Sequence, residues 1–226
     1  SDSNPTTGVT AYTKLKNENK PKMFILATSP VVSAILPLAR ANQDFVIATV
    51  ASAKDIGKNG GESVFRYFNE GYNDGLFISS FINGTGMKRV GCLYLQNELG
   101  TAYRDALVDS FNDPRLIFNE GFQISDNDFS AQILKLKQNN ADSVLIAGTD
   151  RQTLQIIKKI KEFKLNLTIF TNPILSDPNV QIGNEELLEG VYFPIPEFII
   201  STNELAAKFN NEYKVKFGEE SNFYSA

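Results

Sequence analysis

The chain has 226 residues, of which 22 are Lys or Arg and 26 are Asp or Glu, so its formal net charge is −4; it contains one cysteine and no histidine. A chain of this length can bury one substantial hydrophobic core or two smaller ones. The absence of a basic tract argues against a nucleic-acid partner. No apolar run approaches the ~20 residues that span a bilayer. Without histidine, Ser-His-Asp and Cys-His catalysis and His-containing metal sites are excluded, so we predict no catalytic residue, no metal and no cofactor.

The first part of the sequence predicts helices and strands in alternation. Pro5–Asn19 is predicted to be a helix and Met23–Ala27 a strand. The Ser29-Pro30 pair that follows is typical of a helix start, with Ser29 as the cap and proline at the first helical position. Phe45–Val50 is predicted to be the next strand, and it leads into a polar loop over Ser52–Glu62.

Two nearly continuous apolar runs mark the middle of the chain. Val90–Leu95 and Val144–Ala147 have the composition of parallel strands that helices cover on both faces. Cys92 lies inside the first of these runs, so we interpret it as a small buried hydrophobic residue and not as a nucleophile. The chain has no GxxxxGK[ST] phosphate loop.

Helical periodicity separates the predicted strands. Glu70–Asn83 is predicted to be helical despite Gly71 and Gly75, and Thr101 and Ser130 lie near further helix starts that they could cap. The apolar positions at helical spacing are Tyr103, Ala106, Leu107 and Phe111, then Phe129, Ile133 and Leu136, then Leu154, Ile157, Ile160 and Phe163. The alternation predicts an α/β protein built by β/α winding.

Later segments continue the same pattern. Arg115–Phe122, Leu167–Phe170 and Gly190–Phe193 are predicted strands, and a helix is expected from about Asn203 to Phe217. The sequence opens on a helix with no strand before it, and it closes at Asn222–Ala226, where another element begins to form. We therefore expect the chain to be a fragment that is truncated at both ends.

Several segments, in this order and spacing, resemble one protein family over essentially the whole chain. They are DSNPTTGVTAYTKL (Asp2–Leu15), FILATSP (Phe24–Pro30), FVIATVASA (Phe45–Ala53), VFRYFNEGYNDG (Val64–Gly75), RVGCLYLQNELG (Arg89–Gly100), DFSAQILKLKQNNADSVLIAG (Asp128–Gly148) and EGVYFPIP (Glu189–Pro196). The chain resembles the type I periplasmic solute-binding proteins of ABC transporters, in the branch similar to leucine/isoleucine/valine-binding proteins.

This resemblance implies two doubly wound parallel-sheet lobes that face each other across a cleft. Residues 1–68 would form lobe 1, residues 69–195 lobe 2, and residues 196–226 would return to lobe 1. The ligand would lie at the carboxyl ends of the strands, where helix N-termini converge and their free N–H groups favour anionic groups.

The implied function is capture of a small polar ligand, such as an amino acid, and its delivery to the membrane permease of an ABC transporter. The protein would be periplasmic or otherwise extracytoplasmic, with a signal peptide upstream of this sequence. One alternative is a ligand-sensing ectodomain or effector domain with the same fold. An enzymatic alternative would need Glu98 and Asp150 close together with a shifted pKa, and a further alternative is a protein that has lost its ligand.

Residues of lobe 1 keep the chemistry that the resemblance implies. Ser29 and Pro30 in one turn, and Thr49, Ser52 and Ala53 in the next loop, fall where family members grip the carboxylate of an amino acid with a serine hydroxyl and backbone amides.

Residues of lobe 2 depart from the family pattern. Leu99 and the pair Thr149-Asp150 stand where family members present a tyrosine, and Asn172-Pro173 stands where an acid would meet the ligand's ammonium group. Asp150 either supplies the missing negative charge or caps its helix. Tyr72, at the crossing between the lobes, is either a wall of the cleft or a packed aromatic residue.

Overall fold

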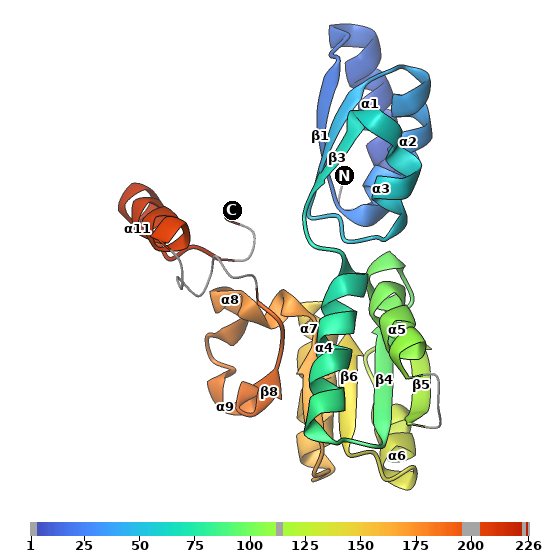
Figure 1. Ribbon diagram of the computed structural model, residues 1–226, viewed down its shortest axis with the longest axis vertical. Helices are drawn as coiled ribbons and strands as arrows, with labels where there is room; N and C mark the ends of the chain where they lie inside the picture. The colour runs from blue at the N-terminus through green and yellow to red at the C-terminus, as the bar shows by residue number, and fades with distance from the viewer. Residues whose placement is uncertain (1–3, 112–114, 196–203, 223–224, 226) are drawn as a thin grey trace.

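The structure, a computed structural model, describes residues 4–111, 115–195, 204–222 and 225. Its strands form two separate parallel sheets, one with the order β1-β2-β3 and one with the order β5-β4-β6-β7-β8. The three-stranded sheet and its helices lie at the top of Figure 1, and the five-stranded sheet lies below them. The predicted α/β fold with parallel sheets is confirmed.

The three-stranded sheet carries its helices on one face (Figure 1). Its elements are α1 (Pro5–Asn19), β1 (Met23–Ala27), α2 (Ser29–Ala41), β2 (Phe45–Thr49), α3 (Asp55–Gly60), the 3₁₀ turn η1 (Gly61–Ser63) and β3 (Val64–Tyr67). Phe24 pairs in register with Val46, and both side chains pack against Val31 and Ile35 of α2. The period of two along the strands therefore places one apolar set under the helices.

The other face of this sheet is also apolar, but it is exposed. Ile25 keeps 68%, Phe65 54% and Tyr67 65% of its surface accessible, and the Phe45 and Phe65 rings stack with their centroids 5.0 Å apart. Hydrophobic burial in the three-stranded sheet therefore comes from its helix side.

The five-stranded sheet is covered on both faces. Its elements are α4 (Gly71–Thr85), β4 (Val90–Leu95), α5 (Glu98–Ser110), β5 (Leu116–Phe122), α6 (Ser130–Gln138), β6 (Ser143–Ala147), α7 (Asp150–Glu162), β7 (Thr168–Thr171), η2 (Pro173–Ser176), α8 (Pro178–Gln181), α9 (Glu185–Leu188) and β8 (Val191–Tyr192), and α11 (Glu204–Phe217) follows. Leu93 and its partner Ile146 pack with residues of α6 and α7, whereas Cys92 and its partner Leu145 pack with residues of α4 and α5. Two-sided burial explains the continuous apolar runs of β4 and β6.

The predicted helix over residues 70–83 is confirmed as α4, and its glycines have a packing role. A Cβ added at Gly75 would lie 2.6 Å from the Cβ of Ala106 in α5, and one added at Gly71 would lie 3.0 Å from the Tyr103 ring. The glycines therefore allow α4 and α5 to approach closely, which offsets their low helix propensity.

Some local predictions need correction. The predicted polar loop Ser52–Glu62 contains α3 and η1, because Ile56 is buried beside Val32 of α2 and draws the segment onto the core. Strand β3 was not predicted, since its burial alternates and two of its side chains are exposed.

The helix caps also differ from the prediction. Helix α2 begins at Ser29 with Thr28 at the cap position, so Ser29 is not the cap. Helix α5 begins at Glu98, and its cap is Asn97, whose side chain accepts a hydrogen bond from the Gly100 N–H at 2.9 Å; Thr101 lies inside the helix.

The lobe limits 1–68, 69–195 and 196–226 stay predictions. The expected crossing at Pro196 lies outside the described residues, as do residues 197–203. Within the part of the chain that the structure describes, no helix combines the length and apolarity of a membrane span.

Candidate functional site

The candidate site is a cavity of about 840 Å³ whose walls come from both sheets. Turns that follow β1, β2, β4, β5, β6 and β7 all contribute to its lining. Because the strands within each sheet are parallel, their carboxyl ends share one edge, and the helices that follow them begin there. The N-termini of α2, α5 and α7 therefore border the cavity, where their free N–H groups can meet a ligand.

Most of the predicted site residues border this cavity. Those that line it are Ser29, Pro30, Ser52, Leu99, Thr149, Asp150, Asn172 and Pro173. Thr49, Ala53 and Tyr72 are not among its lining residues. Thr49 and Ala53 lie directly behind the lining: the Thr49 hydroxyl donates to the Leu26 carbonyl at 3.3 Å, and the Ala53 N–H donates to the Ser29 Oγ at 3.0 Å.

The Ser29 hydroxyl joins the turns after β1 and β2. It is buried and accepts the Ala53 N–H, which leaves its own O–H as a donor. Thr28 and Val50 in these turns have positive φ angles of 67° and 47°, a region that non-glycine residues adopt at a cost of roughly 1–3 kcal/mol. The backbone beside the cavity is therefore held in a conformation that an isolated turn would not favour.

Helix α7 places Asp150 at the rim. Its cap position is Thr149, whose hydroxyl donates to the Gln152 side chain, and Asp150 is the first helical residue. The Asp150 Oδ1 accepts the N–H of Arg151 at 2.7 Å. Asp150 is therefore not the cap residue of α7, although it lies in the first turn, where a negative charge is favourable.

Asn172 provides a buried polar group in the cavity wall. It is 4% exposed, and its Nδ2 donates to the Gly148 carbonyl at 3.1 Å, which fixes the orientation of the amide. Its Oδ1 has no hydrogen-bond partner. A buried amide oxygen without a donor costs roughly 1–3 kcal/mol, so a donor on a bound ligand would recover this loss.

Asp74 and Tyr103 also line the cavity, and sequence reasoning missed both. The Tyr103 hydroxyl donates to the Asp74 Oδ2 at 2.9 Å. Burial raises the pKa of the Asp74 carboxyl, and this effect exceeds the opposing effect of the Tyr103 hydrogen bond. Both residues lie within helices, where no turn signal marks them. The lining also includes polar residues that directly follow β4 and β5, namely Gln96, Asn97 and Gln123. A search of the sequence for polar residues directly after predicted strands could have identified these three.

Tyr72 lies outside the cavity lining and packs between elements. Its hydroxyl donates to the Asp109 Oδ2 of α5 at 2.7 Å, and the Lys54 Nζ lies 3.8 Å from the centre of its ring. The hydrogen bond to Asp109 raises the pKa of the Tyr72 hydroxyl. Both contacts hold Tyr72 outside the described lining, and its role as a wall of the cleft stays a prediction.

Nucleophilic and metal chemistry find little support in the described residues. Cys92 is fully buried, and burial raises the pKa of its thiol to about 12, so the reactive thiolate is disfavoured. No group of three His, Cys, Asp or Glu side chains within these residues could hold a metal ion.

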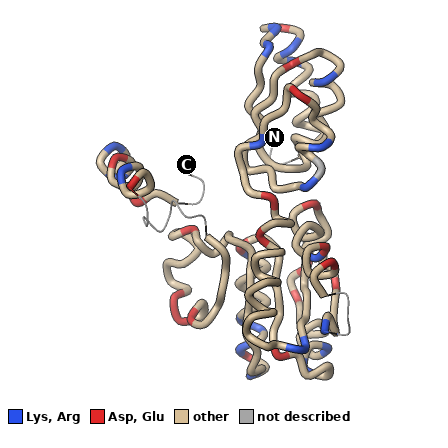
Figure 2. The backbone as a smooth tube through the Cα atoms, in the orientation of Figure 1, with Lys and Arg blue, Asp and Glu red and all other residues tan. Residues whose placement is uncertain are grey.

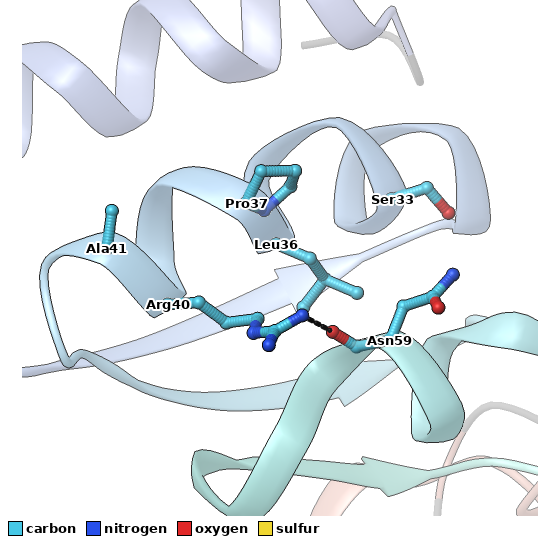
Figure 3. Close-up of a pocket in the computed structure, with 6 residues that line it drawn as sticks. All are labelled: Ser33, Leu36, Pro37, Arg40, Ala41 and Asn59. Carbon is cyan, nitrogen blue, oxygen red and sulfur yellow. Dashed lines mark hydrogen bonds between the residues drawn. The ribbon is translucent and has the colours of Figure 1, made fainter.

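A second cavity, of about 630 Å³, lies away from the strand ends between α2 and α3 (Figure 3). Ser33, Leu36, Pro37, Arg40, Ala41 and Asn59 line it. The Arg40 guanidinium donates to the Asn59 carbonyl at 3.0 Å, so it already ties the two helices together. This hollow involves one sheet's helices alone, and the cavity at the strand ends is the better candidate.

Comparison with known proteins finds one matching family model and several similar solved structures. A family model described as "Periplasmic binding protein" matches residues 1–226. Similar solved structures include a leucine-binding protein, LivK, from Thermotoga maritima, with 21% identity and a TM-score of 0.85 over 98% of this chain and 65% of that chain. No curated protein sequence matches significantly.

Two further similar structures carry bound ligands. The branched-chain amino acid transporter substrate-binding protein LivJ from Streptococcus pneumoniae, in complex with isoleucine, has 18% identity and a TM-score of 0.83 over 98% of this chain and 65% of that one. An ABC transporter solute-binding protein from R. palustris, in complex with benzoate, has 17% identity and a TM-score of 0.86 over 99% of this chain and 63% of that one. The chain thus spans less than two thirds of the length of these proteins, and at such identities the likeness shows the fold.

Proposed function

This chain belongs to the periplasmic binding protein family, and we propose that it is the solute-binding component of an ABC transporter, capturing a small polar ligand such as an amino acid or related compound. The ligand would bind in the cavity between the two sheets and pass to a membrane permease. The protein would act in the periplasm or elsewhere outside the cytoplasm, with a signal peptide that directs it there.

The observation that carries the proposal is a single cavity at the carboxyl ends of strands from two separate parallel sheets. A ligand in such a cavity touches both units at once. The ligand stabilises a closed arrangement of the two units only if it makes more favourable contacts in the closed arrangement than in the open one. The proposal therefore includes the lobe limits: residues 1–68 and 196–226 as lobe 1 and residues 69–195 as lobe 2.

Each side of the cavity has a proposed role in binding. On the first-sheet side, the Ser29 hydroxyl, Ser52 and the backbone N–H groups at the start of α2 would hold a carboxylate. On the second-sheet side, Leu99, Thr149 and Asp150 would contact the rest of the ligand, with Asn172 and Pro173 at the floor.

Thermal unfolding of the full chain against a panel of amino acids, small carboxylates, amides and sugars tests this function. A compound present at ~100 times its dissociation constant adds about 2.7 kcal/mol of stability and raises the midpoint by several degrees. Ser52→Ala should reduce the shift, whereas Ser33→Ala, in the other cavity, should preserve it. A folded protein whose midpoint no compound moves would contradict the proposed function.

A further inference from the structure

The charges that line the cavity all have the same sign. Asp74, Glu98 and Asp150 line it, all from the second-sheet side, and none of its described lining residues is Lys or Arg. Figure 2 agrees, because acidic segments gather at the end of the five-stranded unit that faces the three-stranded one. The cavity therefore has an uncharged wall and an acidic wall.

Basic side chains near the acidic wall are already engaged by other protein groups. The Arg151 guanidinium, which follows Asp150 in the chain, donates to the Ile124 carbonyl at 2.6 Å and to the Asn127 side chain. Arg104 of α5 forms an ion pair with Asp105 at 2.6 Å. Neither cation lines the cavity, so neither neutralises its acids from within.

Helix N-termini do not reverse this balance. Each contributes roughly half an elementary positive charge. Helices α5 and α7 carry Glu98 and Asp150 in their first turns, so at each of these two termini a full negative charge exceeds the partial positive one. Helix α2 has no acid in its first turn, and its N-terminus on the uncharged wall stays attractive to an anion.

Asn172, on the same wall, gives independent support for a ligand that carries a hydrogen-bond donor. Its Oδ1 is a buried acceptor without a donor, and Asn172 lines the cavity. The Gly148 carbonyl holds the Nδ2 group, so the oxygen is the part of the amide left for a ligand. An N–H group of a ligand could donate the missing hydrogen bond to this oxygen, whereas a carboxylate has no hydrogen to donate.

We propose that the ligand carries a net positive charge, with an ammonium or guanidinium group held between Asp150, Glu98 and the Asn172 oxygen. A carboxylate on the same ligand would lie at the start of α2, beside Ser29. The ligand class is thus a cationic amino acid or a closely related amine. This inference deepens the proposed function and rests on it.

Calorimetric titration with matched compounds tests the charge directly. L-Arginine and L-citrulline have nearly the same shape but differ by one positive charge, as do L-lysine and L-norleucine. We expect L-arginine or L-lysine to bind at least tenfold more tightly than its neutral counterpart. Agmatine, which is arginine without its carboxylate, should bind more weakly than arginine, because it cannot use the start of α2.

Charge-removing variants locate the effect. The double variant Glu98→Gln and Asp150→Asn should weaken binding of the cationic compound at least tenfold. Glu186→Gln, an exposed acid in α9, is the matched control and should bind as the parent chain does. Circular dichroism of each variant verifies that it is folded.

The outcomes separate the two proposals. Equal affinity for arginine and citrulline would overturn the inference of a cationic ligand. Binding of norleucine or benzoate, with no binding of any cationic compound, would overturn it as well. Both results would leave the proposed solute binding intact. Failure of every compound in both the charged and the neutral series would overturn the proposed function itself.

Discussion

At the residue scale, Asp44 is the most buried carboxylate among the described residues. It is 1% exposed, accepts the Tyr12 hydroxyl at 2.8 Å and forms an ion pair with Lys16. Burial alone would raise the pKa of its carboxyl, but the hydrogen bonds from Lys16 and Tyr12 together outweigh this, so the pKa lies below its ordinary value. The pair ties α1 to the residue before β2.

This pKa shift predicts a pH dependence of stability. Because the folded pKa lies below the unfolded value of about 3.9, Asp44 stabilises the fold above that pH, and its contribution is lost as the pH falls through the folded pKa. Urea unfolding at pH 7 should show that Asp44→Asn lowers the free energy of unfolding by roughly 1–3 kcal/mol.

The matched control is Glu18→Gln, which removes an exposed acid from the same helix α1. It should leave stability unchanged within about 0.5 kcal/mol. At pH 3 the difference between Asp44→Asn and the parent chain should shrink. A difference that stays the same at both pH values would show that the charge of Asp44 does not stabilise the fold.

At the element scale, the contact between α4 and α5 determines where Asp74 and Tyr103 meet. Gly75→Ala would place its Cβ 2.6 Å from the Ala106 Cβ, a separation that forces the helices apart. We expect a loss of about 1–3 kcal/mol of stability, as for other overpacked cores.

Gly84→Ala in the same helix is the control, because a Cβ there meets nothing within 4 Å. Alanine has the higher helix propensity, so this variant should gain up to about 1 kcal/mol. Thermal unfolding of the two variants should thus move in opposite directions. A loss of similar size in both would assign the cost to the helix itself and not to its packing.

The elements themselves show which parts of the fold the sequence could predict. Strand β4 is buried on both faces, and its unbroken run of apolar residues identified its limits. Strand β3 alternates and exposes Phe65 and Tyr67, so it lacked that signal. Helix α3 is short and contains Gly57 and Gly60, and the burial of Ile56 that draws it onto the core is a tertiary effect.

The candidate site likewise contains residues that the sequence could predict and residues that it could not. Residues in turns after strands, such as Ser29 and Asn172, could be predicted to lie together because parallel strands end at one edge. Asp74 and Tyr103 lie inside helices, and only the close approach at Gly75 brings them together at the cavity. Tyr72 is adjacent in sequence to the crossing, yet its partners Asp109 and Lys54 hold it outside the lining.

At the scale of the whole molecule, a few contacts join the two sheet units beside the cavity. The Gly71 N–H at the start of α4 donates to the Ser52 carbonyl at 3.1 Å, and Lys54 lies over the Tyr72 ring. Arg66 of β3 donates to the Ala53 carbonyl at 2.9 Å and pairs with Glu70 at the crossing. A ligand that bridges the cavity would add to these contacts, so its binding should reduce opening on both sides.

Hydrogen–deuterium exchange of the full chain, with and without saturating L-arginine, tests the central claim most directly. We predict slower exchange in the turns after β1 and β2 and at the starts of α5 and α7, which lie on opposite walls of the cavity, with little change around Arg40 and Asn59. Protection confined to one sheet, or to the hollow between α2 and α3, would contradict a ligand held between the two units.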